Sequence, residues 1–192
     1  MPLSLAIKVV CIGDGYVGKT TLIKAYLRGE ALIDRSYKQT IGAEIFMKES
    51  KYVIEPYGEV AIKWLIWDLA GQPTYRDVRA PYYKGAHAAI AVFDVSRPST
   101  LKNLRYWIAE FFKNVGSIRP LILVGNKIDL RKQQRCLPPE AGMNYAKILS
   151  EQLKIHVEYV ETSAINNINV EQAFKNLAKN LIDFYVKRKA QV

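Results

Sequence analysis

Residues 13–20 read GDGYVGKT and follow the spacing G-x-x-x-x-G-K-[ST]. Glycines at three of these positions let successive backbone N–H groups turn toward one point without a Cβ in the way. A helix that begins at Lys19 presents its positive end to the same point. We therefore predict a phosphate-binding loop in which the Lys19 ammonium reaches the β- and γ-phosphates and the Thr20 hydroxyl binds Mg²⁺. The competing interpretation is a glycine turn that merely ends in Lys-Thr. The residues expected around the phosphates are Gly13, Asp14, Gly15, Tyr16, Val17, Gly18, Lys19, Thr20 and Thr21.

A second polar run, DLAGQ at 68–72, follows the apolar residues WLIW at 64–67. In isolation Asp68 could simply cap a strand, but beside a phosphate-binding loop it is typical of the carboxylate on the Mg²⁺ side. Gly71 would bring a backbone N–H to the γ-phosphate, and the Gln72 side chain would orient an attacking water. We therefore expect Gln72, Lys19 and Gly71 to act in the hydrolysis of a nucleoside triphosphate.

Two further runs indicate which base the nucleotide carries. In NKID at 126–129, Asp129 can accept hydrogen bonds from N1 and the exocyclic amino group of guanine, and adenine has no such pair of donors. In ETSA at 161–164, a small residue can offer a backbone N–H to the guanine O6. An ATPase of the same fold is an alternative, but it leaves Asp129 without a role. The residues expected around the base are Asn126, Asp129, Ser163 and Ala164.

The hydrophobic pattern predicts the elements that position these residues. The expected strands are 5–12, 41–48, 60–68, 86–95, 121–125 and 156–160, with a turn near 55–59. The expected helices are 19–28, a helix capped by Ser99 that ends near 115, 138–152 and 170–187. Strands that alternate with helices indicate an α/β fold with a mostly parallel six-stranded sheet and helices on both faces. Ligands usually bind at the carboxyl ends of such strands. The length of 192 residues favours one domain, residues 1–192.

The net charge of +10 could attract nucleic acid, anionic lipid or acidic protein. No basic run is interleaved with aromatics as in single-strand binders, so we expect a solvated basic surface and no nucleic-acid partner. The basic clusters at 131–135 and 187–189 are expected in a loop and at the terminus. Two cysteines do not make a disulfide framework, which favours a reducing, cytoplasmic location.

Taken together, these motifs resemble those of the Ras-type small GTPases, and most of all those of the Rab branch. The phosphate loop, DLAGQ, NKID and ETSA occur in the family's order, and QTIGAEIF at 39–46 is similar to the Rab switch I segment. The resemblance spans about residues 5–186. It implies the small G protein fold, GTP or GDP and Mg²⁺ as ligands, and slow GTP hydrolysis that drives a molecular switch. It further implies that Thr40 contacts Mg²⁺ and the γ-phosphate, that Tyr37 covers the phosphates, and that Lys127 lies against the base.

Several positions depart from the family pattern. Ile33 stands where an aromatic usually packs on guanine, and Tyr16 occupies a position that is often glycine or alanine. Pro73 follows Gln72 and restricts its backbone to extended conformations, which could either place Gln72 for the water or hold it away. The stretch between Thr40 and Asp68 is longer than in a typical Rab, around 49–59.

The resemblance also implies partners. Activating proteins, exchange proteins and effectors would contact residues 33–45 and 69–83, and an activating partner would supply an arginine, since Arg35 is expected to be a solvated loop residue. No cysteine follows Cys136 and Pro2 excludes N-myristoylation, so we expect no stable membrane anchor and at most transient membrane contact. The alternative function is a scaffold that holds GTP without hydrolysing it and binds acidic protein or nucleic acid.

Overall fold

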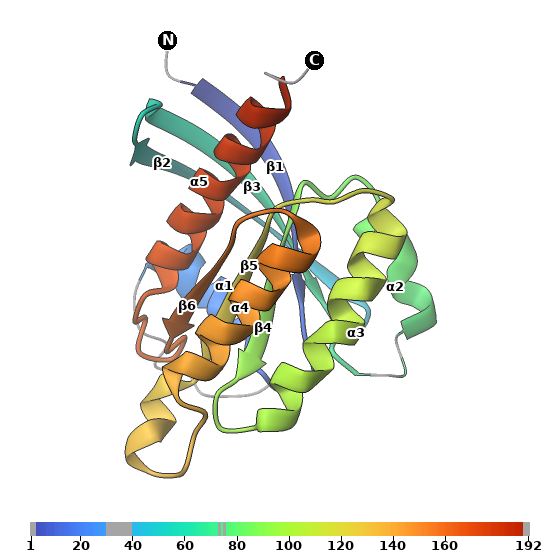
Figure 1. The fold of residues 1–192 in the computed structure, drawn as a ribbon, viewed down its shortest axis with the longest axis vertical. Coiled ribbons are helices and arrows are strands. Elements are labelled where there is room, and N and C mark those ends of the chain that lie inside the picture. The colour runs from blue at the N-terminus through green and yellow to red at the C-terminus, as the bar shows by residue number, and fades with distance from the viewer. Residues whose placement is uncertain (1–2, 30–39, 73, 75, 190–192) are drawn as a thin grey trace.

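The structure, a computed structural model, describes residues 3–29, 40–72, 74 and 76–189 (Figure 1). Tyr37, Ile33, Arg35 and Pro73 lie outside the described residues. The strands are β1 (Leu3–Ile12), β2 (Ala43–Ile54), β3 (Gly58–Leu69), β4 (Ala88–Asp94), β5 (Leu121–Asn126) and β6 (Val157–Thr162). The helices are α1 (Lys19–Arg28), α2 (Arg76–Tyr83), α3 (Pro98–Val115), η2 (Ile128–Lys132), α4 (Pro139–Leu153) and α5 (Val170–Lys189).

The six strands form one sheet in the order β2-β3-β1-β4-β5-β6. β2 pairs with β3 in the antiparallel sense, and every other pairing is parallel. Each parallel connection therefore crosses over through a helix, as the alternating pattern predicts. The expected α/β fold with a mostly parallel six-stranded sheet is confirmed.

The sheet separates two hydrophobic cores because successive side chains of a strand point to opposite faces. Val9 and Cys11 on β1 face a core that includes α1 and α5, whereas Val10 and Ile12 face a core that includes α3 and α4. Helices therefore cover both faces, and the carboxyl ends of the central strands open toward the loops that carry the polar motifs.

An aromatic cluster joins the edge of the sheet to the helices of the first core. The Tyr26 ring on α1 stacks on Phe174 of α5 with centroids 3.5 Å apart, and Trp64 meets the same Phe174 ring edge-on at 5.8 Å. The Tyr26 hydroxyl lies 2.6 Å from the hydroxyl of Tyr52 on β2. Such contacts hold the phosphate-loop helix, the β2–β3 hairpin and α5 together.

The hairpin accounts for the extra length expected around residues 49–59. β2 continues to Ile54 and β3 begins at Gly58, so the additional residues lengthen the two strands and only residues 55–57 form the turn. The prediction of a strand over 41–48 was therefore too short at its carboxyl end.

One helix prediction was wrong in its cap, and one helix was missed. Ser99 does not cap α3, because the helix begins at Pro98 with Arg97 as its N-cap; proline suits this first position since it has no N–H to leave unpaired. The helix α2 was not predicted at all. It has eight residues and contains Pro81, and a helix that short is marginal without tertiary packing.

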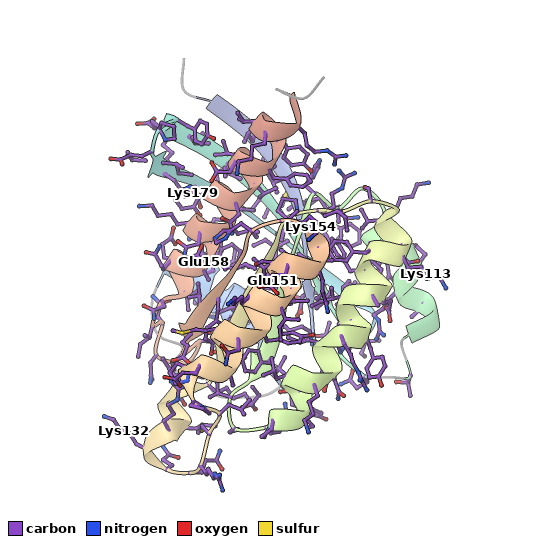
Figure 2. All side chains as sticks on the ribbon, in the orientation of Figure 1. Lys113, Lys132, Glu151, Lys154, Glu158 and Lys179 are labelled. Atoms are coloured by element: carbon purple, nitrogen blue, oxygen red, sulfur yellow. The ribbon has the colours of Figure 1, made fainter. Side chains whose placement is uncertain are left out.

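Basic side chains are spread over the surface. Lys113 on α3, Lys132 on η2, Lys154 after α4 and Lys179 on α5 are all exposed and lie on separate elements (Figure 2). The basic clusters expected in a loop and at the terminus are partly helical, in η2 and at the end of α5. None of the described helices is long and apolar enough to cross a membrane.

His87 gives the fold a pH-dependent contact. Its Nδ1 accepts the backbone N–H of Lys8 at 2.9 Å, and burial together with the positive charges of Arg119 and Lys8 lowers the pKa of His87. As the pH falls, His87 is therefore protonated at a higher pH in the unfolded chain than in the folded protein. The contact stabilises the protein above pH 6.5, and this stability is lost as the pH falls below that value.

We expect His87→Asn, which keeps an acceptor but no titration, to flatten this dependence. Thermal unfolding from about pH 7.5 to about pH 5.5 should show a steeper fall in Tm for the wild type than for the variant. Parallel curves would contradict the role of His87.

Candidate functional site

The backbone carbonyls of residues 13–17 are all held by side-chain donors. Lys19 Nζ donates to the carbonyls of Gly13 and Asp14, both at 2.9 Å. The other donors are Arg97 Nη2 to Gly15 at 3.1 Å, Lys127 Nζ to Tyr16 at 2.6 Å, and Asn126 Nδ2 to Val17 at 3.0 Å. These hydrogen bonds fix the shape of the loop, and the backbone N–H groups of such a loop, together with the positive end of α1, can form an anion-binding concavity.

Two glycines allow the loop to pack this closely. A Cβ on Gly13 would lie 2.2 Å from the carbonyl oxygen of Val92 on β4, and one on Gly18 would lie 2.4 Å from Asn126 Nδ2. Both also have positive φ, +139° and +95°, which glycine adopts at no steric cost. Gly13 and Gly18 are therefore required by the close approach of their neighbours as well as by backbone conformation.

Lys19 and Asp68 form the charged centre of the site. Their side chains are 6% and 0% exposed. Burial lowers the pKa of Lys19 and raises the pKa of Asp68. The negative charge of Asp68 acts to raise the pKa of Lys19, and the positive charge of Lys19 acts to lower the pKa of Asp68, so each charge partly offsets the effect of burial on the other.

Three side-chain groups with oxygen atoms lie close together beside Lys19: the Asp68 carboxylate and the hydroxyls of Thr20 and Thr40. Asp68 Oδ2 accepts hydrogen bonds from the hydroxyls of Thr20 and Thr40, the latter at 3.3 Å, and the two hydroxyl oxygens are 3.0 Å apart. Asp68 Oδ1 is buried and has no hydrogen-bond partner among the described residues. A carboxylate and two hydroxyls are hard oxygen donors, so this set fits Mg²⁺.

Gly71 and Gln72 approach the loop from the end of β3. A Cβ on Gly71 would lie 2.5 Å from Gly15 N and from Lys19 Nζ, so only glycine fits there. The Gln72 side chain lies beside Gly15, where an added Cβ would be 3.8 Å from its Nε2. Gln72 Oε1 is buried with no protein partner within the described part of the chain.

Asn126 ties the end of β5 to the end of β6. Its Oδ1 accepts hydrogen bonds from Thr162 Oγ1 at 3.0 Å and from the Ala164 amide at 3.1 Å. A small residue of the ETSA run was expected to offer its backbone N–H to guanine O6, and the N–H of Ala164 already has this acceptor in the protein. Ser163 Oγ donates to Asp129 Oδ1 at 2.6 Å, which orients the carboxylate expected to read the base.

The sequence analysis missed Asp94 and Arg97. The buried Asp94 carboxylate accepts from Arg97 Nε at 3.0 Å and pairs with Lys127 Nζ at 2.8 Å. Burial acts to raise the pKa of Asp94, but the hydrogen bonds from Lys127 and Ser96 and the charge of Lys127 outweigh burial and lower it. Asp94 thereby aligns two of the cations that hold the loop. The sequence signal that could have identified Asp94 is its position at the carboxyl end of the predicted strand 86–95, because the other site residues also follow the carboxyl ends of strands.

The Asp14 side chain points away from the anion-binding concavity. Its two carboxylate oxygens accept from Asn103 Nδ2 at 2.7 Å and Trp107 Nε1 at 2.8 Å, both on α3. Only the backbone of Asp14 is therefore available to a phosphate. Thr21 follows Thr20 on α1, and Tyr37 is outside the described residues.

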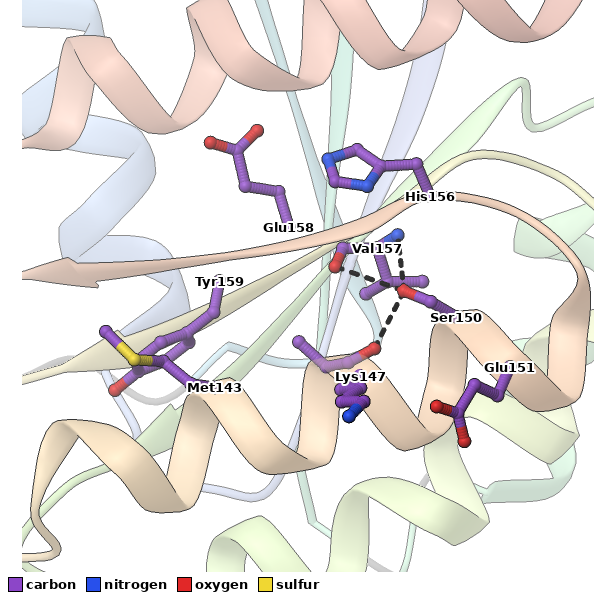
Figure 3. A pocket seen from close by; sticks show the side chains of 9 residues that line it. Met143, Lys147, Ser150, Glu151, His156, Val157, Glu158 and Tyr159 are labelled. Atoms are coloured by element: carbon purple, nitrogen blue, oxygen red, sulfur yellow. Dashed lines mark hydrogen bonds between the residues drawn. The ribbon is translucent and has the colours of Figure 1, made fainter.

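A separate pocket of about 480 Å³ lies between α4 and β6 (Figure 3). Ser150 bridges its two walls, since its hydroxyl accepts the Val157 N–H at 2.9 Å and donates to the Ala146 carbonyl at 2.8 Å. None of the predicted nucleotide-site residues lines this pocket.

Comparison with known proteins agrees with the motifs. Residues 8–183 match the model of the Ras family. The chain is 35% identical to the Ras-related protein RABA2a of Arabidopsis thaliana over 181 residues, which is 94% of this chain and 77% of that protein. It is 38% identical to the Ras-related protein Rab-11A of Dictyostelium discoideum over 170 residues, 88% of this chain and 73% of that protein.

The close approach at Gly18 predicts a stability difference between two glycines of positive φ. An added Cβ at Gly29 meets no atom of the described residues within 4 Å, so Gly29→Ala should cost only the left-handed conformation, about 1 kcal/mol. Gly18→Ala should cost about 1–3 kcal/mol more because the methyl group displaces Asn126. Urea unfolding of both variants with saturating GDP measures the difference, and equal losses would contradict the packing argument.

Proposed function

Because the chain belongs to the Ras family and is a small GTP-binding protein, we propose that it hydrolyses GTP slowly to GDP and acts as a nucleotide-dependent switch. The observation that carries the proposal is the convergence of Thr20, Thr40 and Asp68 beside the buried Lys19, with Asp68 Oδ1 left free of protein partners in the described structure. This arrangement suits the charge of a triphosphate and its cation better than it suits a structural hydrogen-bond cluster.

The chain's own residues then divide the work. The backbone N–H groups of residues 13–18 and the Lys19 ammonium would bind the phosphates, and Thr20, Thr40 and Asp68 would hold Mg²⁺. The ion supplies positive charge that neutralises the phosphate oxygens. Asp129, oriented by Ser163, accepts hydrogen bonds from guanine.

Hydrolysis needs a positioned water more than covalent chemistry. Gln72 lies beside Gly15, and its free Oε1 can accept a hydrogen bond from that water. Arg97 is bound to Asp94 and the Gly15 carbonyl, so its guanidinium is committed to holding the loop. An arginine from a partner is worth about 10³–10⁵ in rate, which is why we propose slow turnover by the protein alone.

Switching would follow from contacts that only the γ-phosphate makes. Thr40 and Gly71 belong to the two segments proposed to bind partners, residues 33–45 and 69–83. The γ-phosphate would hold these segments in one conformation, and they would relax after hydrolysis. Exposed apolar side chains support this surface: Ile41 is 77% exposed, Ile45 50% and Val78 51%. A partner that covers them in one nucleotide state reads the switch.

Gln72→Leu is expected to slow single-turnover hydrolysis of GTP by about 10- to 100-fold, because the water loses its acceptor. The measurement uses Mg²⁺-loaded protein after nucleotide exchange. Gln152→Leu, an exposed change on α4, should leave the rate unaltered. Unassisted fast turnover would contradict the proposal of a slow enzyme. Bound GTP without detectable hydrolysis in the wild type would favour a scaffold.

Asp129→Ala is expected to weaken GTP binding by about 100-fold or more, because hydrogen bonds to a charged group contribute about 1.5–3 kcal/mol each. Its weak affinity for ATP should not change, since adenine offers no donors to this carboxylate. Competition binding measures both nucleotides. Asp183→Ala removes a carboxylate that instead binds Tyr57 at the hairpin, and should alter neither affinity.

A further inference from the structure

Arg79 is a buried arginine on α2 whose side chain reaches back to the turn after β3. The residue is 3% exposed. Its Nη1 donates to the carbonyl of Ala70 at 3.2 Å and to the carbonyl of Gln72 at 3.1 Å. The Ala70 carbonyl shares its peptide plane with the Gly71 N–H, and the Gln72 carbonyl lies one residue beyond Gly71, so a single nitrogen holds the backbone before and after the residue packed against the phosphate loop.

The rest of the guanidinium is fixed by α3, which lies beside α2 (Figure 1). Arg79 Nε and Nη2 donate to the two carboxylate oxygens of Glu110, at 2.9 and 3.1 Å, in the bidentate geometry that arginine forms best. Tyr83 on α2 donates its hydroxyl to the same carboxylate at 2.9 Å. Glu110 therefore compensates the buried charge and sets the direction in which Nη1 points.

The face of the guanidinium is also occupied. It lies 4.2 Å from the ring centre of Trp107, and Trp107 Nε1 donates to Asp14 in the phosphate loop. A continuous set of contacts thus runs from Asp14 through Trp107 and Arg79 to the backbone of Gln72. Both ends are at the site, one in the loop that binds phosphate and the other beside the proposed water-positioning residue.

We propose that Arg79 is a positioning residue for hydrolysis: it holds the Ala70 and Gln72 carbonyls so that the Gly71 N–H and the Gln72 side chain face the phosphate loop. The inference rests on the proposed function, because it assigns to Arg79 the placement of groups that act on GTP. The competing role is purely structural, in which Arg79 only fastens α2 to α3.

Two variants separate these roles without leaving an unpaired buried charge. Arg79→Lys keeps the charge beside Glu110, but one ammonium cannot reproduce the fixed fork that reaches the carboxylate and two carbonyls. Arg79→Met combined with Glu110→Gln removes both charges and leaves an acceptor for Tyr83, which protects the fold. Tyr83→Phe is the matched control, because it removes a hydrogen bond of the same cluster without touching the two carbonyls.

The first readout is single-turnover hydrolysis of GTP, compared with the rate of GDP release. We expect both Arg79 variants to hydrolyse GTP about 10- to 100-fold more slowly, since small misplacements of catalytic groups have effects of this size. GDP release should stay within about twofold of the wild type. A structural role predicts lower stability with an unchanged hydrolysis rate, as we expect for Tyr83→Phe.

The second readout is amide hydrogen exchange across residues 70–72 in the GDP-bound protein. The Ala70 amide donates to the Gly42 carbonyl at 2.9 Å, so its exchange rate reports whether this turn is held. Exchange should be about tenfold faster in both Arg79 variants and unchanged in Tyr83→Phe.

Wild-type rates of hydrolysis and exchange in folded Arg79 variants would overturn the inference. If the wild type itself fails to hydrolyse GTP, the proposed function fails, and exchange alone then decides the matter. Faster exchange would still support Arg79 as the residue that positions Gly71 and Gln72, and unchanged exchange would overturn it.

Discussion

The site depends on the hydrogen bonds that hold the carbonyls of residues 13–17. Each of them has a side-chain donor within hydrogen-bond distance, and none of these donors comes from residues 13–17 themselves. Lys19 comes from α1, Arg97 from the start of α3, and Asn126 and Lys127 from the end of β5. The hydrogen bonds to the Gly13 and Val17 carbonyls are buried, and buried carbonyls without donors would destabilise the fold, so the loop keeps this shape only where these three segments meet it. The anion-binding concavity proposed for this loop is a consequence of that meeting.

Charge at the site is balanced locally although the protein as a whole carries +10. Asp94 compensates Lys127 and Arg97, Glu110 compensates Arg79, and Asp68 lies near Lys19. Burial works against the ionised form of Lys19 and of Asp68, and each is favoured by the other's charge. A polyanion with a divalent cation would add a partner to both, which explains how a nucleotide complex could stabilise this part of the fold.

The segment after β3 shows how a short helix is held in place by side chains. Eight residues with a proline do not form a stable helix alone. Arg79 and Tyr83 anchor α2 to Glu110 on the much longer α3, and Trp107 packs on the Arg79 guanidinium. Because the same α3 also binds Asp14 and carries Arg97 at its start, the phosphate loop and the segment around Gln72 share one support.

The sequence by itself determined the elements and residues whose signal is local. The local signals are the spacing of glycines, lysine and threonine in 13–20, the acid after the apolar run 64–67, and the NKID run. Each lies within a few residues of the chain, and the structure brings all three to the carboxyl ends of the strands. The bounds of α1 were also predictable, because Gly29 in the left-handed conformation ends the helix where glycine was expected to stop it. The roles of these residues toward GTP stay predictions.

Only the tertiary structure decided what supports them. The hydrogen bonds of Arg97 to Gly15, of Trp107 to Asp14 and of Tyr57 to Asp183 join residues 82, 93 and 126 positions apart. No local pattern encodes such pairs, because any polar side chain at those positions would suit a helix start or a turn equally well. The start of α3 is different, because proline at the first helical position is a local signal that the sequence analysis passed over in favour of Ser99. The existence of α2 was missed because its stability comes from packing against distant segments, which a propensity read along the chain does not contain.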